Sequence, residues 1–259
     1  MSQSIWIATS WNELNEWQLQ EIAHLYINTP AEKFPEVYPR MISIVYQKED
    51  TAIHRFELFK LIRNVPMSEL GKFTTFLLEE NNYYRFPAIS GLIKPSDRLG
   101  NITIRQFSTI DTFFHQWNMD RTLIKLKRLV ASLYRIKEKY DDLDLPVVDE
   151  ITRNIPVKQM EAVALAYLFT RMSIAEQYKV VFPEQKEESE EEKKLKPVFK
   201  KKAQQYIPFD KIIIGLSMDE LQPLGKKQDI NDVRIFEFLS VLSESILYHK
   251  EKAKAYEGK

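Results

Sequence analysis

The chain has 259 residues, of which 44% are hydrophobic and 29% charged, enough apolar material for one large or two small folded domains. Lys plus Arg and Asp plus Glu both number 37, so no net charge draws the chain toward nucleic acid or an anionic membrane, and a dedicated DNA-binding protein is disfavoured. Cysteine is absent, which excludes disulfides, thiolate metal sites and cysteine nucleophiles. Because the 6 glycines are too few for Gly-rich phosphate loops and arrays of tight hairpins, the composition predicts a mainly α protein.

Residues 1–80 are predicted to form a unit of three to four helices. The first helix should begin after Asn15, because Asn15 and Gln18 have the spacing of a capping box, in which each side chain bonds a backbone N–H near the other residue. A second helix is predicted around 40–47, and a connecting helix after residue 47. The last helix is predicted to begin at Pro66, because proline in the first turn of a helix costs no hydrogen bond. The core-facing positions of that last helix are expected to be Leu70, Phe73 and Leu77.

Residues 102–183 repeat this pattern. Thr103 and Gln106 have the capping-box spacing again, 88 positions after Asn15 and Gln18. At the same offset RMISIVYQ (40 to 47) matches RLVASLYR (128 to 135), and at an offset of 90 the stretch RNVP before one helix matches RNIP before another. Three blocks in the same order predict a tandem duplication, against the alternative of two unrelated helical hairpins that share common start signals.

Between the two repeats, residues 81–101 are rich in Pro, Gly, Asn and aromatic residues. This composition predicts a loop or a small β insert, packed by Tyr83, Tyr84 and Phe86.

The C-terminal third begins with a charged segment, 184–204, in which an acidic half precedes a basic half. It has almost no apolar residues to offset its ordering entropy, so we predict a flexible linker or a solvated helical extension, and the glutamates oppose phosphate binding by the basic half. A C-terminal helical segment, 205–259, follows. In it, 207–217 is expected to be a short strand or buried turn, and a final helix is expected from about Asn231.

No pattern in the sequence points to catalysis, a cofactor or a metal. The four histidines lack the spacing of metal ligands, and the aspartates of DDLDL (141 to 145) lack the glycine and terminal glutamate of a calcium-binding loop. Nucleophile and phosphate-loop motifs are absent. We therefore expect no catalytic, cofactor-binding or metal-binding residues, although residues distant in the chain can still assemble a site in space.

The candidate partner-binding residues are apolar. Two tryptophans that precede the first capped helix are expected to be exposed, and the apolar stripe of the final helix must pack either on the duplicated body or on a partner protein. The candidates are Trp6, Trp11, Ile235, Phe238, Leu242 and Ile246.

The assembled pattern resembles small helical tail-assembly and virion-associated proteins of tailed bacteriophages, particularly those that infect Bacteroidota. The resemblance is carried by TSWNELNEWQLQEI (9 to 22), ITIRQFSTIDTFF (102 to 114), LKRLVASLYR (126 to 135), the helix started by RNIP (153 to 156) and the closing LSESILYHKEKA (242 to 253). It implies a tail-assembly chaperone or minor virion component without a cofactor. The long charged segment before the last helix departs from the pattern.

The sequence thus predicts a non-enzymatic structural or assembly protein of a phage or prophage, with tail or virion proteins as partners. We expect it in the host cytoplasm during assembly or in the virion, without membrane or nucleic-acid partners, because no signal sequence or membrane span is evident. Self-association stays open. The alternatives are a cytoplasmic helical adaptor unrelated to phage and an enzyme with a site between the repeats.

Overall fold

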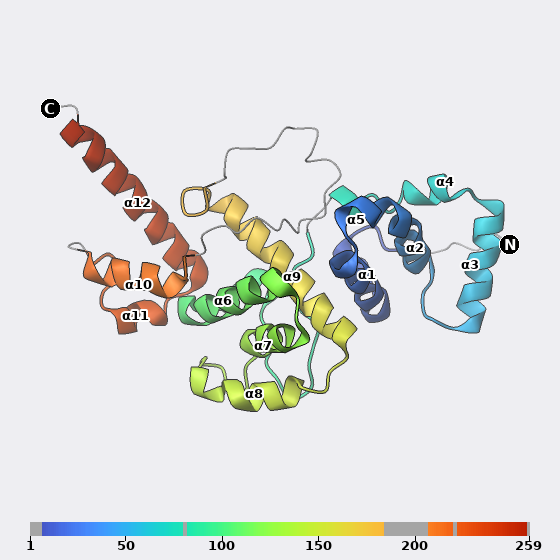
Figure 1. Ribbon diagram of the computed structural model, residues 1–259, viewed down its shortest axis with the longest axis horizontal. Coiled ribbons are helices and arrows are strands. Elements are labelled where there is room, and N and C mark those ends of the chain that lie inside the picture. The colour runs from blue at the N-terminus through green and yellow to red at the C-terminus, as the bar shows by residue number, and fades with distance from the viewer. Residues whose placement is uncertain (1–6, 80–81, 184–206, 220–221, 258–259) are drawn as a thin grey trace. The chain divides into compact units, whose positions relative to one another are not determined.

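The computed structural model describes residues 7–79, 82–183, 207–219 and 222–257 (Figure 1). These residues form helices α1 to α12 and four short 3-10 turns, with no strand among them. The prediction of a mainly α protein is confirmed. No described helix is both long and apolar enough to span a membrane. The predicted linker, 184–204, lies outside the described residues.

The described residues divide into two compact units. Unit 1 contains 7–79, 82–87 and 156–169, and unit 2 contains 88–155, 170–183, 207–219 and 222–257. Helix α9 (Val157–Gln177) therefore contributes its first part to unit 1 and the remainder to unit 2. The predicted second repeat, 102–183, contains the whole of α9, and the first part of this helix packs with the N-terminal helices. The described residues of the predicted C-terminal segment, 205–259, which are 207–219 and 222–257, fall within unit 2.

Unit 1 is built from short helices in sequence. They are η1 (Trp11–Glu13), α1 (Glu16–Asn28), η2 (Ala31–Lys33), α2 (Phe34–Tyr46), α3 (Ala52–Asn64), α4 (Met67–Gly71) and α5 (Phe76–Glu79). The predicted capping box starts α1: the Gln18 N–H donates to Asn15 Oδ1 at 2.9 Å and the Asn15 N–H donates to Gln18 Oε1 at 3.0 Å. Helix α1 packs on α2.

Aromatic side chains at the centre of unit 1 pack against the first part of α9. Phe169 of α9 lies edge-on to Trp11 at 5.4 Å and to Tyr26 at 5.6 Å between ring centroids. The indole Nε1 of Trp11 donates to the carbonyl of Phe76 at 3.0 Å. The buried carboxylate of Glu161, also on α9, lies 2.6 Å from His24 Nδ1. These contacts hold the first part of α9 in unit 1.

One expected core position of unit 1 is exposed. Leu70 and Leu77 are buried as predicted, but Phe73 is 59% exposed. The prediction for Phe73 is wrong because α4 ends at Gly71 and a turn at Lys72 and Phe73 interrupts the helical periodicity before α5 begins.

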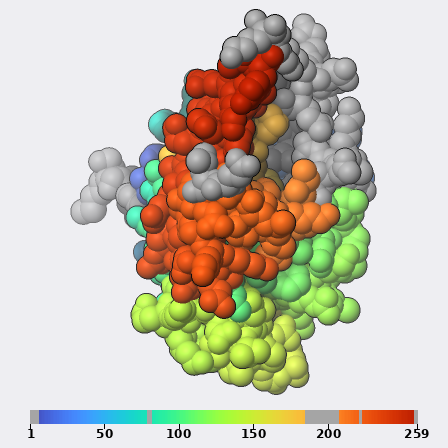
Figure 2. Space-filling view, turned by 90° about the vertical axis from the view of Figure 1, so that its left-hand side faces the viewer, coloured from blue at the N-terminus to red at the C-terminus, as the bar shows by residue number. Residues whose placement is uncertain are grey.

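Unit 2 contains the longer helices. They are α6 (Ile104–Asp120), α7 (Leu123–Leu133), α8 (Leu145–Thr152), the second part of α9, α10 (Phe209–Met218), α11 (Lys227–Asn231) and α12 (Ile235–Glu257), with the turns η3 (Asp97–Leu99) and η4 (Asp142–Asp144). Helix α7 packs between α6 and α8, and α10 to α12 contact α6. Figure 2 shows α10 to α12, in orange and red, on one face of this unit.

The segment 207–217 is a helix, not the expected strand or buried turn. Helix α10 buries Phe209, Ile213 and Leu216, which have the i, i+4, i+7 spacing of one helix face. Phe209 meets the ring of Phe107 on α6 edge-on at 5.2 Å. The run of isoleucines suggested a strand, but packing of this face on α6 decides the outcome.

In each predicted repeat, a buried glutamine links the first two helices. Gln18 Nε2 donates to the carbonyls of Ile44 and Val45, which lie 26 and 27 residues later, at 3.2 and 2.9 Å. Gln106 Nε2 donates to the carbonyls of Ser132 and Leu133, again 26 and 27 residues later, at 3.0 and 3.2 Å. The start of one helix is thereby tied to the end of the next in each unit. The duplication itself stays a prediction.

The second capping box is formed only in part. Thr103 Oγ1 accepts from the Gln106 N–H at 3.4 Å, but Gln106 Oε1 is buried without a hydrogen-bond partner in the described part of the chain. Instead, the backbone at the start of α6 pairs with the backbone at the start of α12. The Ile104 N–H donates to the carbonyl of Val233 at 2.8 Å, and the Ile235 N–H donates to the carbonyl of Ile102 at 3.0 Å. Sequence spacing indicated the cap but not this pairing.

The inter-repeat segment is a loop. From residue 82 onward it has no helix except η3, and Tyr83 and Phe86 are buried while Tyr84 is half-buried. A single antiparallel β-bridge joins Ile93 to Arg135. The loop alternative of the sequence prediction therefore describes residues 82–101.

Candidate protein-interaction surface

Helix α3 exposes its large apolar side chains. None of its 13 residues, all of which the structure describes, is buried. Ile53, Phe56 and Phe59 are 71%, 57% and 62% exposed. Figure 1 shows α3 at the edge of unit 1, beyond α2. Exposed phenylalanine and isoleucine side chains gathered on one element are typical of a protein interface.

The polar contacts of α3 are local. Thr51 accepts from the His54 N–H and caps the helix, and Arg55 donates to Asp50 at 2.7 Å. The ammonium of Lys60 lies 4.4 Å from the centre of the Phe56 ring, one helical turn away. These contacts stabilise the helix itself and leave its apolar surface uncovered.

Helix α8 follows α7 as α3 follows α2, but α8 is packed. It lies against α7 and buries Val148 and Thr152, which are 1% and 0% exposed. Ninety positions earlier, the corresponding residues are Leu58, which is half-buried, and Ile62, which is 36% exposed. Unit 2 thus buries one side of α8, whereas α3, at the corresponding position in unit 1, has no buried residue.

Most of the sequence-predicted partner-binding residues lie in a core instead. Trp11 is 1% exposed, so the prediction that it is exposed is wrong: η1 directs its ring among Tyr26, Phe76 and Phe169. Trp6 lies outside the described residues.

The stripe of α12 packs on the protein's own unit 2. Ile235, Phe238 and Leu242 are buried, and Ile246 is half-buried. Of the two predicted alternatives, the body rather than a partner covers the first three, because the start of α12 pairs with the residues before α6 and packs on α6. The candidate residues therefore do not form one surface: the α12 residues belong to unit 2, and Trp11 is part of the core of unit 1.

Sequence reasoning missed α3 because its pattern is not amphipathic. Its six large apolar residues fall on all sides of the helix instead of on one stripe. An amphipathic stripe identifies a core face, and its absence led to the description of this segment as a connector. A short helix whose large apolar residues are spread around its whole circumference is the signal that would have identified it, since no single packing face can cover them all.

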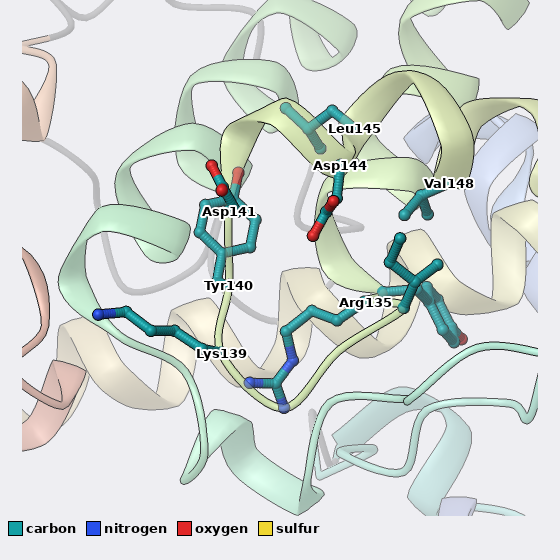
Figure 3. Close-up of a pocket in the computed structure, with 9 residues that line it drawn as sticks. Arg135, Lys139, Tyr140, Asp141, Asp144, Leu145 and Val148 are labelled. Carbon is teal, nitrogen blue, oxygen red and sulfur yellow. The ribbon is translucent and has the colours of Figure 1, made fainter.

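A small hollow in unit 2 is too small for an organic substrate. Its cavity volume is ≈ 10 Å³, about the room that one water molecule needs, and it is lined by residues from Tyr134 to Val148, with Arg135, Asp141 and Asp144 around it (Figure 3). Small-molecule sites begin at about 300 Å³.

The charged groups around this hollow are engaged with the protein. Arg135 Nη1 donates to the carbonyl of Glu138 at 2.7 Å, and burial lowers the pKa of the Arg135 guanidinium. Asp144 accepts from Lys137 at 2.9 Å, and Lys139 donates to Asp232 at 2.7 Å. These bonds fix the loop between α7 and α8, which is a structural role.

Three further ion pairs lie apart from this hollow. Arg171 on α9 donates to the buried Asp111 of α6 at 2.5 Å, and His249 lies 2.8 Å from Asp219. Asp142 of the DDLDL turn accepts from Arg105 at 2.8 Å. Among the described residues, no group of three His, Asp or Glu side chains has the arrangement to hold a metal ion.

No protein-family model, no curated protein and no solved structure matches this chain.

Proposed function

We propose that this chain is a structural or assembly protein that acts through helical protein–protein contacts, with α3 as its binding surface. The exposure of Ile53, Phe56 and Phe59 carries this proposal. Burial of such a side chain by a bound partner would stabilise the complex by about 1.5–3 kcal/mol relative to leaving it in water.

The phage assignment rests on the sequence resemblance. We propose a tail-assembly chaperone or minor virion component of a phage or prophage, present in the host cytoplasm during assembly or in the virion. Its partners would be tail or virion proteins, and it would act without catalysis or a cofactor. The exposed helix suits this role, because an assembly protein needs an apolar surface that a partner covers.

The proposal includes the duplication of a helical unit. The glutamines at 18 and 106 each donate to the carbonyls 26 and 27 residues later, at the end of the next α-helix. These observations support two copies of one ancestral unit over two unrelated hairpins.

The test is a pull-down from cells that produce the phage, with wild-type protein and two variants. Phe59→Asp places a charge on α3, while the matched control Leu143→Asp places one at a residue of η4 that is 82% exposed. We expect tail or virion proteins with the wild type and with Leu143→Asp, and their loss with Phe59→Asp. Recovery of host metabolic proteins alone, or equal recovery with both variants, would contradict the proposal.

A further inference from the structure

The exposed side of α3 carries cations as well as apolar side chains. The half-buried residues of this helix have the i, i+4, i+7 spacing of one helix face and are His54, Leu58 and Leu61. The opposite side is exposed, and its residues are Ile53, Phe56, Phe59, Lys60 and Arg63. Lys60 lies one helical turn after Phe56, and Arg63 lies one turn after Phe59. The two positive charges therefore lie among the apolar side chains and not on a separate polar side.

These two cations have no acidic partner in the described part of the chain. The ammonium of Lys60 lies over the Phe56 ring, and Glu57, the one acidic residue of α3, forms no ion pair with Lys60 or Arg63. Arg55, by contrast, is paired with Asp50 at 2.7 Å. Lys60 and Arg63 are three residues apart on one face of the helix, where like charges repel.

The corresponding positions of unit 2 carry an ion pair instead. Ninety positions later, Glu150 takes the place of Lys60 and Arg153 the place of Arg63, and Arg153 binds Glu150 at 2.5 Å. The arginine at the end of α8 thus has a carboxylate one turn earlier, whereas Arg63 has a second cation there. A carboxylate from outside the chain would neutralise both Lys60 and Arg63.

We propose that α3 docks in an apolar groove of a partner protein, and that carboxylates of this groove bind Lys60 and Arg63. Ile53, Phe56 and Phe59 follow one another at three-residue spacing and serve as the apolar anchors of the docked helix. The opposite charges fix the register of the helix in the groove and disfavour partners with basic grooves. This inference rests on the proposed function in taking α3 as the binding surface, and it adds the chemistry of the partner.

The placement of the cations argues against a lipid bilayer as the partner. A helix at a membrane surface keeps its lysines and arginines on a polar side while its apolar side enters the acyl chains. Insertion of this side of α3 would carry Lys60 and Arg63 into the bilayer together with Phe56. Nucleic acid fits poorly as well, because two cations neutralise few phosphates and Ile53 has no ring on which a base can stack.

A displayed library of random peptides tests this chemistry on the whole chain. Peptides of about 16 residues are long enough for about four helical turns. We expect the selected peptides to combine Leu or Phe with Asp or Glu, and to lose binding when the chain carries Phe59→Asp. Selected peptides without enrichment of Asp and Glu, or binders that Phe59→Asp does not affect, would overturn the proposal.

Substitution of the two cations separates the charge from the apolar contact. The double variant Lys60→Gln, Arg63→Gln should weaken binding of a selected acidic peptide, measured by fluorescence anisotropy, by about tenfold or more. The control Lys250→Gln, Lys254→Gln removes the same charge from exposed positions of α12 and should change the affinity by less than about twofold. Because α3 has no buried residue, the first variant should keep its helical circular dichroism. Equal affinity of the two double variants would contradict the role of Lys60 and Arg63.

Lys60→Glu gives Arg63 the same partner that Arg153 has in unit 2. We expect this variant to bind the acidic peptide more weakly than the double variant Lys60→Gln, Arg63→Gln, since the new carboxylate repels those of the peptide. An affinity equal to that of the wild type would overturn the proposal.

Three other occupants of α3 are measured with the same variants. The probes are vesicles of anionic phospholipid, single-stranded DNA and the chain itself in sedimentation velocity. We expect no α3-dependent binding to any of them. Vesicle binding, DNA binding or self-association that Phe59→Asp abolishes would assign α3 to that occupant instead of an acidic groove.

These results separate this inference from the proposed function. Tail or virion proteins that are lost on Phe59→Asp but recovered equally by the wild type and by Lys60→Gln, Arg63→Gln would sink the acidic groove and leave the proposed function standing. Acidic peptides that need Lys60 and Arg63, for a protein that recovers only host metabolic proteins, would leave the acidic groove standing and sink the proposed function.

Discussion

Gln18 and Gln106 share two hydrogen bonds at the same sequence spacing, each from the side-chain amide to two carbonyls at the end of the next helix, and Gln18 also donates to the Gln47 carbonyl at 3.2 Å. Both glutamines are buried, and so are Ile44, Val45, Ser132 and Leu133, whose carbonyls accept these hydrogen bonds. Each glutamine therefore satisfies carbonyls that a helix end leaves without an intrahelical partner.

Gln106→Leu removes this donor from unit 2. It should leave the carbonyls of Ser132 and Leu133 without their side-chain donor and lower the free energy of unfolding by about 1–3 kcal/mol. Urea denaturation measures the change. Gln20→Leu, which removes only an exposed bond to Glu16, is the control and should cost less than about 0.5 kcal/mol. Equal effects of the two substitutions would contradict the role of Gln106.

Trp11→Ala should destabilise unit 1 rather than remove a binding contact. The side chain is 1% exposed and lies against three aromatic rings, so its loss should cost about 3–5 kcal/mol. Denaturation followed by circular dichroism measures the loss. A stable variant that fails only in partner binding would restore the sequence-based prediction for this residue.

Arg171→Met breaks the buried pair with Asp111. The carboxylate of Asp111 is 1% exposed, so removal of the guanidinium that binds it should cost about 3–5 kcal/mol. Lys72→Met provides a matched control, because Lys72 pairs with Glu69 in solvent and such pairs contribute about 0–1 kcal/mol. If both substitutions change the free energy of unfolding equally, the pair does not stabilise unit 2.

Tyr26 should make unit 1 sensitive to alkaline pH. Burial raises the pKa of its phenol from 10.0 to about 12, so the unfolded chain releases this proton at a lower pH than the folded chain. The contribution is fully present below pH 10 and is lost as the pH rises through about 12, by about 2–3 kcal/mol.

Tyr26→Phe should remove this part of the alkaline loss, as measured by urea denaturation across that pH range. Tyr256→Phe, at a residue that is 70% exposed, should leave the loss unchanged. An identical pH profile for Tyr26→Phe and the wild type would show that this phenol does not titrate differently on folding.

Local signals predicted most helices correctly. Asn15 with Gln18, and proline before α4 and α9, mark helix starts through hydrogen bonds and dihedral angles that neighbouring residues determine. Leu70 of α4 and Leu77 of α5 are buried as helical spacing predicted, whereas the break between these two helices leaves Phe73 exposed.

Tertiary contacts decided what the sequence could not show. Trp11 precedes the first capped helix, and only Phe169 and Phe76, which are distant in the chain, make its site a core. The division of α9 between two units depends on the same long-range contacts. The difference in burial between α3 and α8 depends on which helices pack against each of them, which periodicity does not encode.

Amide hydrogen exchange of α3 tests the central claim most directly. In a dilute solution of the single chain, the amides of Ala52–Asn64 should exchange much faster than those of the buried stretch 160–169, since no side chain of α3 is buried in the described structure. They should become protected when the chain is bound to its partner. Protection of α3 equal to that of 160–169 at high dilution would show that the chain covers this helix itself, and would contradict its role as a binding surface.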